Sequence, residues 1–82
     1  MEFRSIDDIK QLIESIMHYL GSASAYYDKF EWFSKVRYTT TTEYFGELRI
    51  FLLEIMNKKE VMQFRSELRD MYRAVDKVLR SK

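Results

Sequence analysis

The sequence has no cysteine, no proline, two glycines and a single histidine. Without cysteine the chain can form neither a disulfide nor a thiolate metal site, and it has no cysteine nucleophile. A protein without disulfides suits a reducing compartment, so we expect a cytoplasmic location. Because proline and glycine interrupt helices most strongly, their scarcity favours long, unbroken helices.

The sequence also lacks an excess of either charge and lacks a long apolar run. Its 82 residues carry a formal net charge of +1, which gives the whole molecule no strong attraction to nucleic acid or anionic lipid. The most apolar stretch, Ile50–Leu53, lies between Arg49 and Glu54 and cannot span a bilayer. The first residues lack the basic and apolar regions of a signal peptide, so we expect a soluble protein without a membrane partner.

Asparagine and glutamine are rare as well. One Asn and two Gln stand beside 27 formally charged side chains, a composition that favours a thermophilic source. Five methionines argue against such a source. Composition alone therefore leaves the thermophilic and mesophilic alternatives open.

The length of 82 residues allows one domain, and we predict a single helical-bundle domain over residues 1–82. A core of this size typically contributes only ~3–5 kcal/mol unless a cross-link, a metal or a partner subunit adds to it. With no disulfide available, a second copy of the chain is a simple source of further buried surface. We therefore expect a homo-oligomer, with a dimer favoured.

A first helix is predicted over Ser5–Leu20. Ser5 can cap its start, and Asp8 three residues later gives a spacing that resembles a capping box. Gly21 is suited to end the helix, because glycine accepts the positive φ that often follows a last helical turn. The apolar residues recur at steps of three and four and form one stripe: Ile6, Ile9, Leu12, Ile13, Ile16 and Leu20.

A second helix is predicted over Ser24–Arg37, with Ser22 or Ser24 as its cap. The segment Tyr38–Thr42 that follows has the aromatic and β-branched residues typical of a strand. An isolated strand would have nothing to pair with in this sequence. We therefore expect an extended connector whose last threonines cap the next helix.

A third helix is predicted from the threonines at 40–42 to Ile55, with Thr40 and Glu43 at capping-box spacing. Gly46 inside this helix costs roughly 1 kcal/mol relative to alanine, which favours the close approach of another helix at that point. The apolar stripe of the helix consists of Phe45, Leu48, Leu52 and Ile55, widened by Tyr44, Phe51 and Met56.

The junction after Ile55 has two interpretations. Asn57 and Glu60 match a cap followed by a carboxylate, and the stripe that ends at Ile55 is not continued, so we favour a break and a fourth helix up to about Arg80. The alternative is one bent helix, since no glycine or proline forces a turn. The fourth segment has the spacing of a coiled coil at Val61, Phe64, Leu68, Met71, Val75 and Val78. The predicted fold class is all-α, a small antiparallel bundle of three to four helices.

No arrangement in the sequence has the spacing of a catalytic or metal site. His18 follows Glu14 by one helical turn, a common surface contact that binds metal poorly on its own. Glu43, Glu47 and Glu54 share a helix but lack the Glu-x-x-His motif of di-iron bundles. No nucleophile elbow and no glycine-rich phosphate loop occurs. We therefore expect no catalytic residue, no cofactor and no metal, and we do not expect an enzyme.

Aromatic residues are more numerous than a chain of this size can readily bury. They number 13, and a domain of roughly 60–80 residues hides only about 60% of its chain surface. We therefore expect about half of the 34 bulky apolar side chains that follow Met1 to be fully buried. The alternative is that tyrosines occupy half-exposed positions without any partner. The candidate protein interface comprises Tyr26, Tyr27, Phe30, Trp32, Phe33, Tyr38 and Tyr44.

A basic stripe lies on the fourth predicted helix. Asp70 and Asp76 lie within one turn of its last cations, but Arg65 and Arg69 have no such acid on their own helix. We favour neutralisation of these two by glutamates of another helix, in the same chain or in a neighbouring one. The alternative is contact with a nucleic-acid backbone. The candidate anion-binding residues are Arg65, Arg69, Arg73, Lys77 and Arg80.

The function that these patterns favour is binding. We expect a small non-enzymatic protein-interaction module, acting through a self-associating helical bundle. An adaptor, an inhibitor or an assembly factor, of the kind that small viral or mobile-element genomes encode, fits its size. The alternative is a helical nucleic-acid-binding protein that uses the basic stripe of the last helix.

Overall fold

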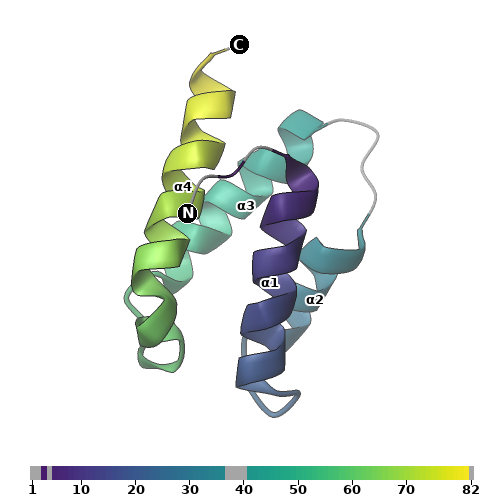
Figure 1. Ribbon diagram of the computed structural model, residues 1–82, viewed down its shortest axis with the longest axis vertical. Coiled ribbons are helices and arrows are strands. Elements are labelled where there is room, and N and C mark those ends of the chain that lie inside the picture. The colour runs from purple at the N-terminus through teal and green to yellow at the C-terminus, as the bar shows by residue number, and fades with distance from the viewer. Residues whose placement is uncertain (1–2, 4, 37–40, 82) are drawn as a thin grey trace. The chain divides into compact units, whose positions relative to one another are not determined.

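The computed structural model describes residues 3, 5–36 and 41–81, and in these residues the chain is all-α (Figure 1). The predicted class, a small all-α helical bundle, is confirmed. None of the helices in the described residues is both long and apolar enough to cross a membrane. The elements in chain order are α1 (Ile6–Leu20), α2 (Tyr27–Lys35), α3 (Thr41–Ile55), the 3₁₀ helix η1 (Lys59–Phe64) and α4 (Arg65–Arg80).

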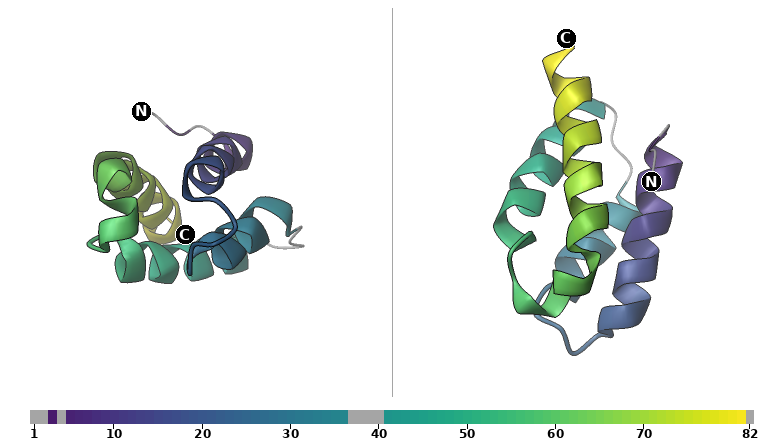
Figure 2. Two further views of the ribbon diagram at one scale, coloured as in Figure 1. Left: turned by 90° about the horizontal axis from the view of Figure 1, so that it is seen from below. Right: turned by 60° about the vertical axis from the view of Figure 1, so that its left-hand side comes forward.

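The chain divides into two compact units, one containing α1 and α2 and the other containing α3, η1 and α4. In each unit the two α-helices run antiparallel and are joined at one end (Figures 1 and 2). The first unit is therefore a hairpin of α1 and α2, and the second is a hairpin of α3 and α4. The expectation of a single domain over residues 1–82 stays a prediction.

The start and end of α1 follow the sequence closely. The Ser5 hydroxyl accepts a hydrogen bond of 3.4 Å from the backbone N–H of Asp8, as the cap at this position predicted. Gly21 ends the helix with a φ of 76°, a conformation that favours glycine, and its N–H donates to the carbonyl of Met17. One face of the helix is buried through Ile9, Leu12, Ile13, Ile16 and Met17.

The second helix begins three residues later than predicted. Ser24 lies in the turn between the helices, where its hydroxyl accepts a hydrogen bond of 3.1 Å from the N–H of Tyr26. A serine that bonds its own neighbouring backbone in this way stabilises a turn in place of a first helical turn. α2 therefore begins at Tyr27 without a side-chain cap, and its short length leaves Phe30 and Phe33 as its buried residues. Lys10 of α1 donates to the carbonyl of Val36 at 3.3 Å and joins the end of α2 to α1.

The predicted break between the third and fourth helices is confirmed, but the predicted cap is not. Asn57 lies in the turn after Ile55, and η1 begins at Lys59 with Lys58 before it and no side-chain cap. Because the apolar stripes on the two sides of this turn are out of register, folding back lets both be buried. The proposed Thr40 cap and the predicted connector at 38–40 lie outside the described residues, whereas Thr41 and Thr42 already belong to α3.

The core of the second hairpin comes from the faces that α3 and α4 turn toward each other. Leu48, Leu52 and Ile55 of α3 are fully buried, and Leu68, Met71 and Val75 of α4 have no exposed surface. Val61 is also fully buried in η1, four residues before α4 begins. In the described part of the chain 17 hydrophobic residues are buried, half of the 34 bulky apolar side chains that follow Met1.

The two glycines differ in the reason for which the fold accepts them. Gly21 has a positive φ, whereas Gly46 lies inside α3 with ordinary helical geometry. No described residue of this chain approaches Gly46 closely, because a Cβ built there meets no atom within 4 Å, so the close helix approach expected there stays a prediction. Within this chain, Gly46 therefore weakens α3 without making room for a neighbour.

Replacing each glycine by alanine should change stability in opposite directions. We expect Gly21→Ala to lower the free energy of unfolding by about 1–3 kcal/mol, because its backbone conformation is open to glycine almost alone. Gly46→Ala should raise it by up to about 1 kcal/mol, because alanine is the better helix former. Urea denaturation of both variants in dilute solution measures the difference, and a stabilising Gly21→Ala or a destabilising Gly46→Ala contradicts the account.

Candidate functional site

The seven aromatic candidates do not form one surface. Tyr38 lies outside the described residues, and Phe30, Phe33 and Tyr44 are buried. Tyr26 and Tyr27 are half-buried, while Trp32 is 44% exposed. The helical period explains the separation on α2, because Phe30 and Phe33 lie three residues apart on the inner side and Trp32 lies between them in sequence. Among the described candidates, Trp32 is therefore the most accessible to a partner, followed by Tyr26 and Tyr27 near the start of α2.

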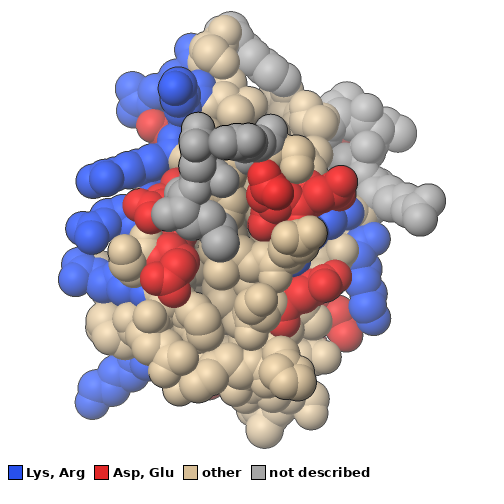
Figure 3. Space-filling model, viewed as in Figure 1, with Lys and Arg blue, Asp and Glu red and all other residues tan. Residues whose placement is uncertain are grey.

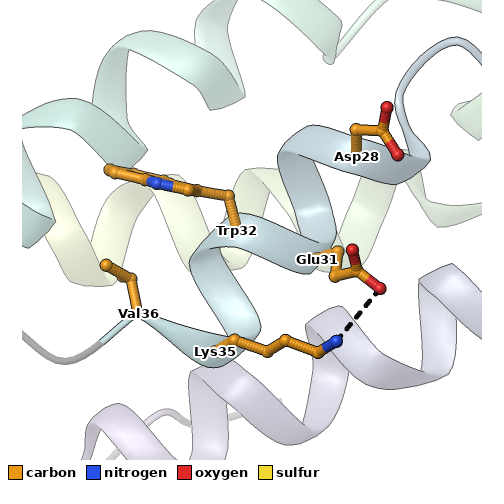
Figure 4. A pocket seen from close by; sticks show the side chains of 5 residues that line it. All are labelled: Asp28, Glu31, Trp32, Lys35 and Val36. Atoms are coloured by element: carbon orange, nitrogen blue, oxygen red, sulfur yellow. Dashed lines mark hydrogen bonds and ion pairs between the residues drawn. The ribbon is translucent and has the colours of Figure 1, made fainter.

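A shallow hollow of about 310 Å³ lies beside Trp32 (Figure 4). Its other lining residues are Asp28, Glu31, Lys35 and Val36, all on α2 or at its end. The Lys35 ammonium group and the Glu31 carboxylate form an ion pair at 3.3 Å, and the indole and Val36 extend to the opposite side of the hollow in Figure 4. An indole next to a paired cation and anion gives an amphipathic site that suits one side chain of a protein partner.

A second accessible apolar surface lies on α3, on the side away from its buried residues. Ile50 is 68% exposed and Leu53 is 58% exposed, and Gly46 lies one turn before Ile50 on the same side. We call these three residues the outer seam of α3. Glu43, Glu47 and Glu54 lie along it and are exposed.

The outer seam was missed in the sequence, although a signal for it is present. Gly46, Ile50 and Leu53 follow one another at steps of four and three, and the same rhythm extends back to Glu43 and on to Asn57. This is the spacing of a coiled-coil stripe. The outer seam was not predicted because the larger apolar stripe on the same helix, which includes Leu48 and Leu52, is sufficient to predict an amphipathic helix.

The third surface is the outward face of α4. Arg65, Arg69 and Arg73 and the following Lys77 and Arg80 are all exposed, opposite the buried Leu68, Met71 and Val75. Figure 3 shows Lys and Arg side chains gathered along the left-hand edge, where α4 lies in Figure 1. The five predicted anion-binding residues are therefore brought together on one helix face.

The cations of this face differ in whether they are paired. Arg80 donates to Asp76 at 2.7 Å, as the sequence spacing predicted, and Arg49 of α3 donates to the other oxygen of Asp76 at 2.9 Å. Within the described part of the chain, no carboxylate lies within ion-pair distance of the remaining four cations. The predicted neutralisation of Arg65 and Arg69 by glutamates of the same chain is therefore absent there. We call Arg65, Arg69, Arg73 and Lys77 the basic row.

Asp76 connects α3 with α4 through its two arginine partners. Burial raises the pKa of Asp76, but the hydrogen bonds and positive charges of Arg49 and Arg80 lower it by more. The pKa therefore lies below the ordinary value of an aspartate. The ionised form is therefore the form that the folded hairpin stabilises. We call the two ion pairs of Asp76 with Arg49 and Arg80 the clamp; Arg49 directly precedes Ile50 of the outer seam.

The remaining side-chain chemistry is sparse. No three His, Asp or Glu side chains come together as a metal site requires in the residues that the structure describes. Buried side chains in the same residues are all hydrophobic. Comparisons of the chain with protein-family models, with curated proteins and with solved structures give no match.

The clamp at Asp76 makes stability depend on acid pH. Because the folded pKa is lowered, the stabilisation by Asp76 is complete above its unfolded pKa of about 4 and is lost as pH falls through the folded pKa. Asp76→Asn should therefore lower the urea midpoint at neutral pH, and the difference from the parent should vanish at low pH. Glu14→Gln, an exposed carboxylate with no ion pair to described residues, is the control. An equal difference at both pH values contradicts the clamp.

Proposed function

We propose that the protein is a non-enzymatic interaction module that acts as a homodimer, with the two copies meeting along the outer seam of α3. The observation that supports this most strongly is the exposure of Ile50 and Leu53 beside a glycine that this chain does not need for its own packing. Large, exposed aliphatic side chains on one helix face are typical of a surface that another helix covers.

A second copy fits the outer seam in chemistry and in register. The seam places an isoleucine and a leucine at alternating positions of a heptad, the pair that favours parallel two-stranded coiled coils. In a parallel pair, Gly46 opposes the partner's Gly46, where the absence of side chains lets the helices come close. Arg49 and Glu54 flank this seam at the outer heptad positions, and Arg49 keeps its ion pair with Asp76 of its own chain.

The size of the outer seam indicates a weak dimer. Fully burying one leucine or isoleucine contributes about 1.5–3 kcal/mol. Four such side chains, each with roughly 60% of its surface still to bury, contribute roughly 4–7 kcal/mol in the pair. Association costs at least about 4 kcal/mol in lost translation and rotation. These terms leave at most about 3 kcal/mol, which corresponds to a dissociation constant of several millimolar or weaker.

The hollow beside Trp32 gives the module a surface for a different protein. It lies on α2, in the hairpin that does not contain the outer seam. Trp32 supplies a large contact area with a polar N–H, a combination that is enriched where proteins bind one another. A homodimer that carries two such sites would suit an adaptor, an inhibitor or an assembly factor.

The dimer is tested by placing charge on the outer seam. Sedimentation velocity of the parent from micromolar to millimolar concentration should show an average mass that rises above the chain mass of 10.0 kDa as the millimolar dissociation constant is approached. Ile50→Glu with Leu53→Glu should give the monomer mass throughout, because apposed carboxylates repel. The control is Met62→Glu, an exposed apolar residue on η1, which should leave the curve unchanged.

Circular dichroism checks that the double variant remains helical, because glutamate is a good helix former on an exposed face. A parent that stays monomeric at the highest soluble concentration, or a double variant that dimerises as the parent does, overturns the proposal.

The parallel orientation has its own test, because the chain has no native cysteine. Glu43→Cys places one thiol at the start of the seam, where it faces its counterpart only if the helices are parallel and in register. Mild oxidation should therefore give a covalent dimer of this variant. Gln63→Cys, an exposed position on η1, should not cross-link under the same conditions. Failure of Glu43→Cys with success of Ile50→Cys indicates an antiparallel dimer.

A further inference from the structure

The basic row forms a regularly spaced line of charge that winds gradually around α4. Its four cations follow one another every four residues, so each lies about 6 Å further along the α4 axis and about 40° around it. The row is therefore about 18 Å long from Arg65 to Lys77. The helix that carries the row is held in place, because Leu68, Met71 and Val75 on its opposite side are fully buried.

The positive charge of α4 exceeds its negative charge, since five cations stand against the three acids Glu67, Asp70 and Asp76. Like charges at four-residue steps repel one another, so the arrangement weakens the isolated helix. Asp76, the acid nearest to the end of the row, is already engaged by Arg49 and Arg80. A line of exposed cations that is unfavourable within the chain and has no ion pair to described carboxylates suits an external anion with repeated charges.

The surroundings of the row distinguish between classes of polyanion. A membrane-surface helix inserts its apolar face between lipids, but the apolar face of α4 is buried against α3. Single-stranded nucleic acid is usually held by aromatic rings that stack with bases, and Tyr72, the aromatic residue of α4, is half-buried. A rigid row of point charges matches a rigid row of phosphates, as found along a duplex.

We propose that the basic row binds the phosphate backbone of double-stranded nucleic acid. The Arg65, Arg69 and Arg73 guanidinium groups can each donate two hydrogen bonds to one phosphate, and Lys77 adds a point charge. Contacts from these four side chains to phosphate oxygens carry no sequence information. Binding is therefore expected to be indifferent to base sequence.

This site is independent of the proposed dimer, because it lies on α4 and the outer seam lies on α3. A monomer presents at most four row cations, so the logarithm of the binding constant should fall with the logarithm of salt concentration with a slope of about −3.6. If both copies of a dimer contact the same duplex, the slope approaches about −7. The monomeric Ile50→Glu, Leu53→Glu variant should keep the smaller slope, which separates failure of the dimer from failure of this site.

The test is fluorescence anisotropy of a labelled DNA duplex of about 20 base pairs with the full chain, over a range of salt concentrations. Arg65→Gln with Arg69→Gln should weaken binding at least tenfold at low salt and reduce the slope by about 2 for each row that contacts the duplex. The matched control is Lys29→Gln with Lys35→Gln, which removes the same charge from exposed positions of α2 and should leave the slope unchanged.

Thermal unfolding of both double variants shows whether folding is retained, and removing repulsion along α4 should leave the row variant at least as stable as the parent. The proposal is overturned if the parent does not bind the duplex at low salt, or if both double variants lose affinity equally. It is also overturned if vesicles containing phosphatidylserine are bound in place of the duplex. A row variant that loses only thermal stability assigns these residues a structural role instead.

Discussion

A hairpin of two helices can bury only one side of each helix, and this limit governs the surface of the molecule. In the second hairpin, α3 turns Leu48, Leu52 and Ile55 toward α4, so that any apolar residue on its other side has no partner in the hairpin. Ile50 and Leu53 are such residues. The same limit applies to α4, whose inner side is apolar and whose outer side carries the basic row. Each proposed surface is the side of a helix that the hairpin leaves uncovered.

The elements that sequence predicted well are those whose signals are local. Ser5 and Gly21 are adjacent to the ends of α1, and the turn after Ile55 follows from two stripes that cannot both face one core. Asn57 was placed wrongly as a cap, because it lies within the turn and η1 begins two residues later, at Lys59. Ser24 likewise has the residue type of a helix cap but bonds within the preceding turn.

The surfaces were harder to predict, because burial depends on which side of a helix meets the rest of the chain. Tyr44 and Trp32 are similar as amino acids, yet one is almost fully buried and the other is exposed. The aromatic residues chosen as interface candidates are divided between the core, where Phe30, Phe33 and Tyr44 are buried, and the surface, where Trp32 is exposed. The spacing of the basic row was readable in the sequence. The coordinates were needed to show that its four members have no ion pair to described carboxylates, while Asp76 pairs with Arg49 and Arg80.

The position of Trp32 also gives the molecule a built-in optical reporter. It is the single tryptophan of the chain and lies on α2, whereas the hairpin of α3 and α4 contains none. Emission from the indole therefore follows the surroundings of the first hairpin, while far-ultraviolet dichroism follows helices throughout the chain. Comparing the two signals during heating resolves whether both hairpins melt as one cooperative unit or in succession, without attaching any dye.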